Sequence, residues 1–144
     1  MSKPVTPFLA VDCVAFNSMS KILVIKRKFP PFKGMFALPG GFVDVGEKVE
    51  DACRREMREE TCVDVDRLYL FGVFSDPGRD PRGHTVSIAF ATLLNKVSPV
   101  AGDDASEVKW LSDWSNTTFA FDHKKIIQEA YKFMRRKQLI YPNN

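Results

Sequence analysis

The chain has 144 residues, of which 44% are hydrophobic and 27% are charged, as expected for one globular domain. The formal net charge of +3 is too small to indicate a nucleic-acid-binding protein, and the sequence carries no aromatic or glycine motif of that class. No apolar run approaches the length of a membrane-spanning helix. Residues 1–144 are therefore expected to form a single domain without a membrane segment.

The three cysteines, Cys13, Cys53 and Cys62, are odd in number and lack the CxxC spacing of zinc sites. This usage argues against a zinc site or a disulfide framework and fits a reducing cytoplasm best. Basic residues cluster at 26–28 and 135–137. These clusters suit an anionic substrate and a solvated surface equally well, and Arg27 is the candidate substrate contact among them.

The first part of the chain predicts a hairpin followed by a loop. Residues 8–16 and 21–28 have the pattern of two strands, separated by the turn-forming Asn17 and Ser18. Residues 29–41 contain three prolines and three glycines. We expect this segment to be a shaped loop without regular structure.

A helix is predicted from about Glu47 to Thr61. Acidic residues in its first turn suit the positive end of a helix dipole. At roughly 100° per residue, one side of this helix is an apolar stripe of the kind that faces a core. The stripe consists of Val49, Ala52, Cys53 and Met57.

Carboxylates interrupt this apolar stripe. Glu56 and Glu60 fall near its middle, and Glu59 flanks it. Burying ionised carboxylates is unfavourable unless they are paired or bound to a cation, and the single Arg55 cannot neutralise all of them. A solvated acidic helix would instead carry its glutamates on the polar side. The pattern therefore favours a helix that binds a divalent metal.

The second half of the chain predicts strands at 68–75, 84–94 and 107–111, with loops at 76–83 and 98–106. A final helix is expected over 122–137, with apolar residues on one face and basic residues at its C-terminal end. The order of elements predicts a mixed sheet with two principal helices, which is an α+β or layered α/β fold.

Residues 41–63 resemble the Nudix box. The pattern of that family is a glycine, five residues, a glutamate, seven residues, and then Arg-Glu-apolar-any-Glu-Glu-any-Gly-apolar. Gly41, Glu47 and the run from Arg55 to Glu60 match it, and Cys62 replaces the closing glycine. The resemblance implies an α/β/α sandwich around a mixed β-sheet. It also implies a hydrolase of nucleoside diphosphates linked to another moiety, with Mg²⁺ or Mn²⁺ as cofactor.

The same resemblance assigns roles to individual residues. Glu56 and Glu60 would be metal ligands, and Glu59 would be a third ligand or the base that orients the attacking water. The backbone carbonyl of Gly40 would complete the metal site. Arg55 can hold Glu59 in place through an i,i+4 ion pair, which makes both of them catalytic candidates.

Two further residues of the box have structural roles. Glu47 is expected to brace its loop and Arg55 rather than touch the metal. Cys62 stands where the family's glycine ends the helix in a left-handed conformation, and a side chain costs ~1 kcal/mol there. This departure puts the end of the helix in doubt, and not the metal site.

The loop at residues 75–85 resembles the ADP-ribose pyrophosphatase branch, in which a proline follows the box by about fifteen residues; Pro77 fits that position. Arg79 and Arg82 offer planar donor forks suited to phosphate. Asp80 could accept hydrogen bonds from ribose hydroxyls. A structural turn with internal Arg–Asp pairing is the alternative for each of these residues.

Two groups of residues are weaker candidates. Phe36 could stack on a base, as could four other phenylalanines, although aromatic residues at such positions often belong to the core; these four are Phe29, Phe32, Phe119 and Phe121. The acidic segment that contains Asp103, Asp104 and Glu107 resembles the place where several family members carry a further ligand or general base. Asp104 and Glu107 are therefore additional catalytic candidates, with simple solvated acids as the alternative.

The function expected from these observations is hydrolysis of ADP-ribose to AMP and ribose 5-phosphate. One alternative is a pyrophosphatase that removes oxidised nucleoside triphosphates. Another is a non-catalytic sensor of ADP-ribose, although regulators of that kind carry a DNA-binding domain for which 144 residues leave little room. The expected partner is a small-molecule nucleotide, without nucleic acid or membrane, and a homodimer is left open.

Overall fold

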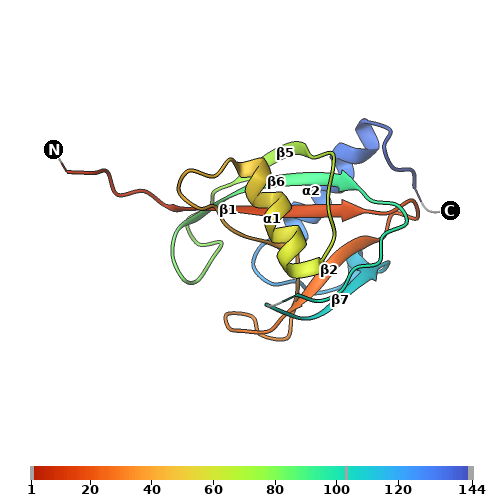
Figure 1. Cartoon of the computed structure of the whole chain (residues 1–144), viewed down its shortest axis with the longest axis horizontal. Helices are drawn as coiled ribbons and strands as arrows, with labels where there is room; N and C mark the ends of the chain where they lie inside the picture. Colours follow the sequence, from red (N-terminus) through yellow and green to blue (C-terminus); the bar gives the residue numbers. More distant parts are fainter. Residues whose placement is uncertain (1, 103, 143–144) are drawn as a thin grey trace.

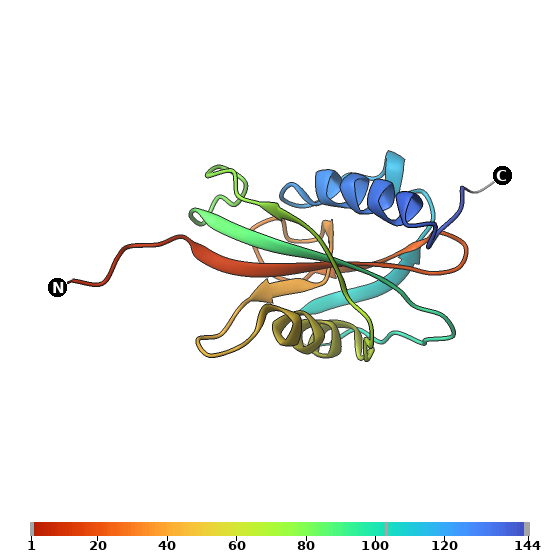
Figure 2. The same cartoon turned by 90° about the horizontal axis from the view of Figure 1, so that it is seen from above.

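The structure is a computed structural model that describes residues 2–102 and 104–142. A mixed β-sheet forms its middle layer, with helix α1 (Val49–Thr61) on one face and helix α2 (His123–Arg136) on the other. Figures 1 and 2 show the three layers from two directions. The predicted α/β/α sandwich is confirmed.

Within the described residues the sheet has seven strands, in the order β3-β2-β1-β6-β5, with β4 also paired to β1 and β7 to β2. The strands β1 and β6 run parallel, and the other pairs are antiparallel. A short 3-10 helix, Trp114–Asn116, precedes α2. The strand bounds are β1 Phe8–Phe16, β2 Ile22–Arg27, β3 Phe36–Ala37, β4 Gly40–Phe42, β5 Tyr69–Phe74, β6 Thr85–Leu93 and β7 Ala105–Leu111.

The predicted elements are present with ends shifted by one or two residues, but the expectation for residues 29–41 was wrong. Two short strands, β3 and β4, lie inside this segment and pair with β2 and β1. These two strands are compatible with the prolines of the segment because Pro39 lies between β3 and β4. The Pro39 carbonyl accepts a hydrogen bond from the Cys13 N–H at 2.9 Å, and this pairing does not require an N–H on the proline.

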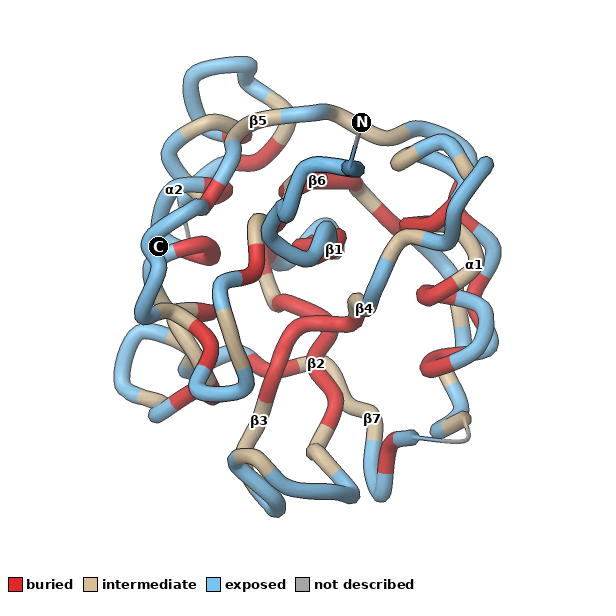
Figure 3. Tube along the Cα trace, turned by 90° about the vertical axis from the view of Figure 1, so that its left-hand side faces the viewer, coloured by how far each residue is buried: buried red, intermediate tan, exposed pale blue. Residues whose placement is uncertain are grey.

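The strand β1 serves both halves of the core because its side chains alternate between the two faces of the sheet. Val11 and Cys13 pack in a cluster with α1 residues, whereas Val14 and Phe16 pack in a cluster with α2 residues. In Figure 3 the buried stretches follow the central strands and the inner faces of both helices. Of the helices in the described part of the chain, none has the length and apolar character needed to cross a membrane.

The C-terminal end of α1 is closed by a loop from much later in the chain. Cys62 adopts the left-handed conformation (φ 59°, ψ 27°), as expected where the family has glycine. The carbonyls of Glu60 and Thr61 accept hydrogen bonds from the N–H groups of Gly102 and Val100 at 2.9 and 2.8 Å. A Cβ atom on Gly102 would overlap the Glu59 carbonyl, so this loop docks directly on the helix backbone.

Candidate active site

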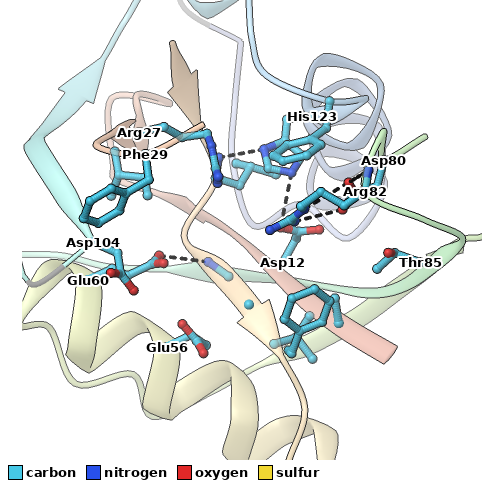
Figure 4. Close-up of a pocket in the computed structure, with 18 of the residues that line it drawn as sticks. Asp12, Arg27, Phe29, Glu56, Glu60, Asp80, Arg82, Thr85, Asp104 and His123 are labelled. Atoms are coloured by element: carbon cyan, nitrogen blue, oxygen red, sulfur yellow. Dashed lines mark hydrogen bonds and ion pairs between the residues drawn. The ribbon is translucent and has the colours of Figure 1, made fainter. Parts of the chain in front are cut away.

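A cavity of about 370 Å³ opens where β4 lies against β1, which is within the usual range for small-molecule sites. Figure 4 shows carboxylates from α1 on one side and guanidinium groups on the other. The lining of the cavity comes mainly from β1, β2, β4 and α1, from the loop at 76–83 and from the start of α2. The lining includes Asp12, Arg27, Phe29, Gly40, Gly41, Phe42, Glu56, Glu60, Arg79, Asp80, Arg82, Thr85, Asp104, Phe121 and His123.

The two glutamates predicted on the apolar stripe are buried, with Glu56 9% and Glu60 6% exposed. The glycines of β4 allow them to approach the strand. The Gly40 N–H donates a hydrogen bond to Glu60 Oε2 at 3.0 Å. A Cβ atom on Gly41 would lie only 2.5 Å from Glu56 Oε1, so a side chain there would displace the carboxylate.

Burial makes this pair of carboxylates difficult to ionise. Desolvation raises the pKa of Glu56 to about 7, although Arg55 donates a hydrogen bond to it. Desolvation also raises the pKa of Glu60, and the charge of Glu56 raises it further. The site therefore carries more buried negative charge than its protein partners compensate, and a bound cation would relieve this.

Arg55 organises the acidic residues around it. Its guanidinium contacts both oxygens of Glu47 at 2.8 and 2.9 Å, and Glu56 at 2.8 Å. The predicted pair with Glu59 is present at 3.3 Å, and the Phe42 carbonyl accepts a further bond at 3.0 Å. These hydrogen bonds lower the pKa of Glu47 to about 2. Glu47 thus braces the loop before α1, as expected from the sequence.

The donor chemistry of the site suits a hard divalent cation, because the carboxylates of Glu56 and Glu60 and the backbone of Gly40 line the same cavity. Within residues 2–102 and 104–142, however, no three acidic, histidine or cysteine side chains already form a cluster that could hold a metal. The Glu59 side chain is 52% exposed and is turned towards Arg55. Glu56 and Glu60 are therefore the two box glutamates that lie buried in the lining of the cavity.

Arg82 forms one part of the opposite, cationic wall. Its Nε and Nη2 atoms donate to the two oxygens of Asp80 at 3.1 and 2.8 Å. The guanidinium also lies over the rings of Phe42 and Phe121, 5.4 and 5.5 Å from their centroids. The internal Arg–Asp pairing considered for this loop is thus present, and it holds Arg82 in one orientation.

Arg27 forms the second part of this wall. Its guanidinium lies 5.0 Å from the centroid of Phe121, and its Nε donates to the Pro31 carbonyl at 2.7 Å. Desolvation and the neighbouring Arg82 both lower the pKa of Arg27. Two cationic groups that repel each other across Phe121 favour the binding of an anion between them.

Arg79 also lines the cavity, but carboxylates already occupy its guanidinium. Its side chain is 5% exposed and contacts Asp122 through Nε and Nη2 at 3.0 and 2.7 Å. Asp12 lies 3.7 Å away. Arg79 therefore ties the loop at 76–83 to the residue before α2, and this occupancy leaves it less free to bind phosphate than Arg27.

The remaining predicted residues have three different outcomes. Asp104 lines the cavity beside Glu60 (Figure 4). Glu107 is exposed on β7 and pairs with Lys26 at 3.8 Å, and Phe36 packs against the α2-side core; neither lines the cavity. Asp103 lies outside the described residues.

Two buried residues of the cavity, Asp12 and His123, were not predicted from the sequence. Ser87 Oγ donates to Asp12 Oδ2 at 2.5 Å, and His123 Nε2 lies 3.4 Å from Asp12 Oδ1. Desolvation raises the pKa of Asp12 and lowers that of His123. A carboxylate in the middle of an apolar strand was the signal for Asp12, whereas the sequence around His123 contains no comparable signal.

Residues 6–130 match the family model described as the NUDIX domain. The chain belongs to the Nudix family. The prediction of a Nudix hydrolase from residues 41–63 is therefore confirmed. The chain is 48% identical over 127 residues to the ADP-ribose pyrophosphatase of Methanocaldococcus jannaschii, a match that covers 88% of this chain and 75% of that protein.

Solved Nudix structures are similar in fold. A MutT/nudix family protein from Enterococcus faecalis superposes with a TM-score of 0.86 at 34% identity, covering 94% of this Nudix chain and 65% of the other. The NUDIX domain of Shewanella oneidensis NrtR, crystallised with ADP ribose, superposes with a TM-score of 0.85 at 29% identity, covering 90% of each chain.

Proposed function

We propose that this Nudix protein hydrolyses ADP-ribose to AMP and ribose 5-phosphate, with Mg²⁺ or Mn²⁺ as cofactor. The observation that carries the proposal is the cavity itself, in which the buried Glu56–Glu60 pair faces the guanidiniums of Arg27 and Arg82. This arrangement suits a diphosphate that is bound together with a cation. The similarity to an ADP-ribose pyrophosphatase and to an ADP-ribose-bound domain favours ADP-ribose as that diphosphate.

The metal would be held by the carboxylates of Glu56 and Glu60 and by the Gly40 carbonyl. Glu59 would complete the set or orient the attacking water, and Asp104, beside Glu60, is the other acid placed to do so. When bound, the cation offsets the charge of the diphosphate and lowers the pKa of water. Arg55 keeps Glu56 and Glu59 in orientation through its hydrogen bonds.

The opposite wall would bind the substrate. Arg27 and Arg82 would contact the phosphate oxygens, and Asp80 would fix Arg82 and accept from a ribose hydroxyl with its remaining lone pairs. Phe29 lines the cavity and offers a ring for the adenine. Water attacks one phosphorus, the bridging P–O bond breaks, and the oxygen of water remains on one of the two monophosphate products.

A substrate panel tests this proposal. The purified protein is incubated with Mg²⁺ and ADP-ribose, NADH, a sugar nucleotide or 8-oxo-dGTP, and the products are separated by chromatography. We expect AMP and ribose 5-phosphate from ADP-ribose at the highest kcat/KM. Release of pyrophosphate from 8-oxo-dGTP as the dominant reaction would support the nucleotide-sanitising function instead.

A sensor is the second candidate, because the chain resembles the ADP-ribose-bound domain of NrtR. The complete set of box carboxylates favours catalysis over sensing. Calorimetry that shows tight binding of ADP-ribose, together with the absence of turnover, would establish the sensor and reject the enzyme.

We also propose that the protein is cytoplasmic. Its three cysteines are free, which suits a reducing compartment. A nucleotide is the proposed partner, and light scattering of the purified protein tests whether it forms a homodimer.

A further inference from the structure

His123, the first residue of α2, contacts the backbone of the segment that carries the Gly40 carbonyl. The Leu38 N–H donates to His123 Nδ1 at 3.0 Å, and this hydrogen bond is buried. Because Nδ1 accepts, the proton of the neutral imidazole has to sit on Nε2. Nε2 faces Asp12 Oδ1 at 3.4 Å, so the two contacts together select one tautomer and one ring orientation.

Residues 38–40 are each tied to a different element. Leu38 is held by His123 of α2, the Pro39 carbonyl by the Cys13 N–H of β1, and the Gly40 N–H by Glu60 of α1. The hydrogen bond at Leu38 ties the backbone of this segment to α2 on the far side of the sheet, where the Leu38 side chain also packs in the α2-side core. Without it, an N–H buried between two layers would lose its acceptor.

Asp12, the partner of His123, is itself fixed. Ser87 Oγ donates to one of its oxygens at 2.5 Å, and Arg79 Nη2 lies 3.7 Å from the same oxygen. Asp12 also pairs with Gly40 in the register of β1 and β4. The imidazole is therefore oriented by the carboxylate of the β1 residue that pairs with Gly40.

We propose that His123 is a positioning residue for the cation site. By accepting the Leu38 N–H it fixes the path of residues 38–40, and with it the orientation of the Gly40 carbonyl relative to Glu60. The inference rests on the proposed function in one respect, namely that the cation binds at Gly40, Glu56 and Glu60. His123 thus makes α2, which contains no residue of the Nudix box, part of the structure that supports the cation site.

Two substitutions at His123 separate this role from simple packing. His123→Phe keeps an aromatic ring but removes the acceptor for Leu38, whereas His123→Asn places an amide oxygen near the position of Nδ1. We expect His123→Phe to lower kcat and to weaken Mn²⁺ binding, each by about 10-fold or more, as for other residues that orient metal ligands. The KM for ADP-ribose should change little, and His123→Asn should recover most of both losses.

A matched control distinguishes positioning from loss of stability. Ile127 is fully buried on the same helix and packs in the α2-side core. Ile127→Val should lower the midpoint of thermal unfolding by a few degrees without altering Mn²⁺ binding. An equal loss of Mn²⁺ affinity in Ile127→Val would overturn the positioning role, because general loosening would then explain the effect.

Mn²⁺ binding is measured by electron paramagnetic resonance without substrate, and the exchange of the Leu38 amide by NMR. Wild-type Mn²⁺ affinity in folded His123→Phe would overturn the inference whether or not ADP-ribose is hydrolysed. A third outcome separates the two proposals. If the wild type binds Mn²⁺ more tightly than His123→Phe but does not hydrolyse ADP-ribose, then the proposed function fails and the positioning role stands. If His123→Phe does not fold, the ¹⁵N shifts of the wild-type ring decide, since a proton on Nδ1 contradicts the inference.

Discussion

Glu60 places an ionisable group in the middle of the surface that α1 buries against the sheet. Its side chain is almost fully covered, and the Gly40 N–H is the hydrogen-bond donor that reaches it. Hydrogen bonding to a single N–H does not offset the desolvation of a carboxylate, which is why the pKa of Glu60 is raised. The buried carboxylate therefore costs stability, and a cation bound at the proposed site would offset that cost.

Glu60→Gln should lower kcat by at least about 100-fold, because it removes one charge from the cation site without changing shape. The amide oxygen can still accept from the Gly40 N–H, so the free energy of unfolding should not fall. Steady-state kinetics and urea denaturation measure the two quantities. Glu50→Gln, an exposed charge removal in the first turn of the same helix, is the control and should leave kcat unchanged. A wild-type kcat in Glu60→Gln would contradict the ligand assignment.

Cys62 departs from the family pattern, and this departure lowers the stability of the fold. The residue occupies the left-handed region, where a Cβ is unfavourable. Cys62→Gly should therefore raise the free energy of unfolding by about 0.5–1 kcal/mol after allowing for the greater flexibility of the unfolded chain. Thermal denaturation compares it with Cys62→Ala, which removes the thiol but keeps the Cβ. An equal gain in both variants would assign the effect to the thiol and not to the backbone.

At the scale of elements, α1 depends on the loop at residues 98–102 for the satisfaction of its last carbonyls. The loop donates two backbone hydrogen bonds to Glu60 and Thr61, which follow directly on the catalytic candidate Glu59. This docking also brings Asp104 to the cavity. The C-terminal turn of α1 and the acidic loop therefore form one structural unit.

Gly102→Ala tests this unit. The new Cβ would overlap the Glu59 carbonyl, so the loop has to move away, and we expect a loss of about 1–3 kcal/mol in the free energy of unfolding. Gly78→Ala is the control, since a Cβ at Gly78 meets nothing within 4 Å. Chemical denaturation of both variants gives the comparison, and equal stabilities would show that the loop does not dock as described.

The elements that the sequence predicted correctly have strong local patterns. The period of α1, including its two buried glutamates, is visible within one short segment, and β1 was predicted with the correct ends. The strands β3 and β4 were missed because they are two and three residues long and exist only through pairing with β2 and β1. Their prolines and glycines indicate a loop as long as the partner strands are not considered.

At the scale of the whole molecule, the cavity combines contributions from both helix layers. The acidic side could be predicted because the Nudix box is contiguous. The contact between Leu38 and His123 could not be, since 85 positions separate the two residues and only the fold brings them together. The role of Arg79 could not be predicted for the same reason. The sequence shows a guanidinium that could bind phosphate, but it does not show that Asp122 already pairs with this guanidinium.

The pH dependence of stability provides a test of the ion pair between the loop before α1 and the helix. The pKa of Glu47 is lowered from 4.5 to about 2 by hydrogen bonds from Arg55. A lowered carboxylate pKa stabilises the fold above pH 4.5, and this contribution is lost as the pH falls towards 2. Urea denaturation should show Glu47→Gln less stable than the wild type at pH 7, with the difference shrinking below pH 4.5. A difference that is constant between pH 3 and pH 7 would contradict this assignment.

The alternation of side chains along β1 limits how this protein can change during evolution. Asp12 points to the layer of His123, while its neighbours Val11 and Cys13 pack beneath α1. The insertion or deletion of one residue in β1 would exchange the two faces, moving the carboxylate under α1 and an apolar side chain next to the imidazole. Substitutions in β1 can accumulate one at a time, but its length cannot vary without separating the two layers that the cavity joins.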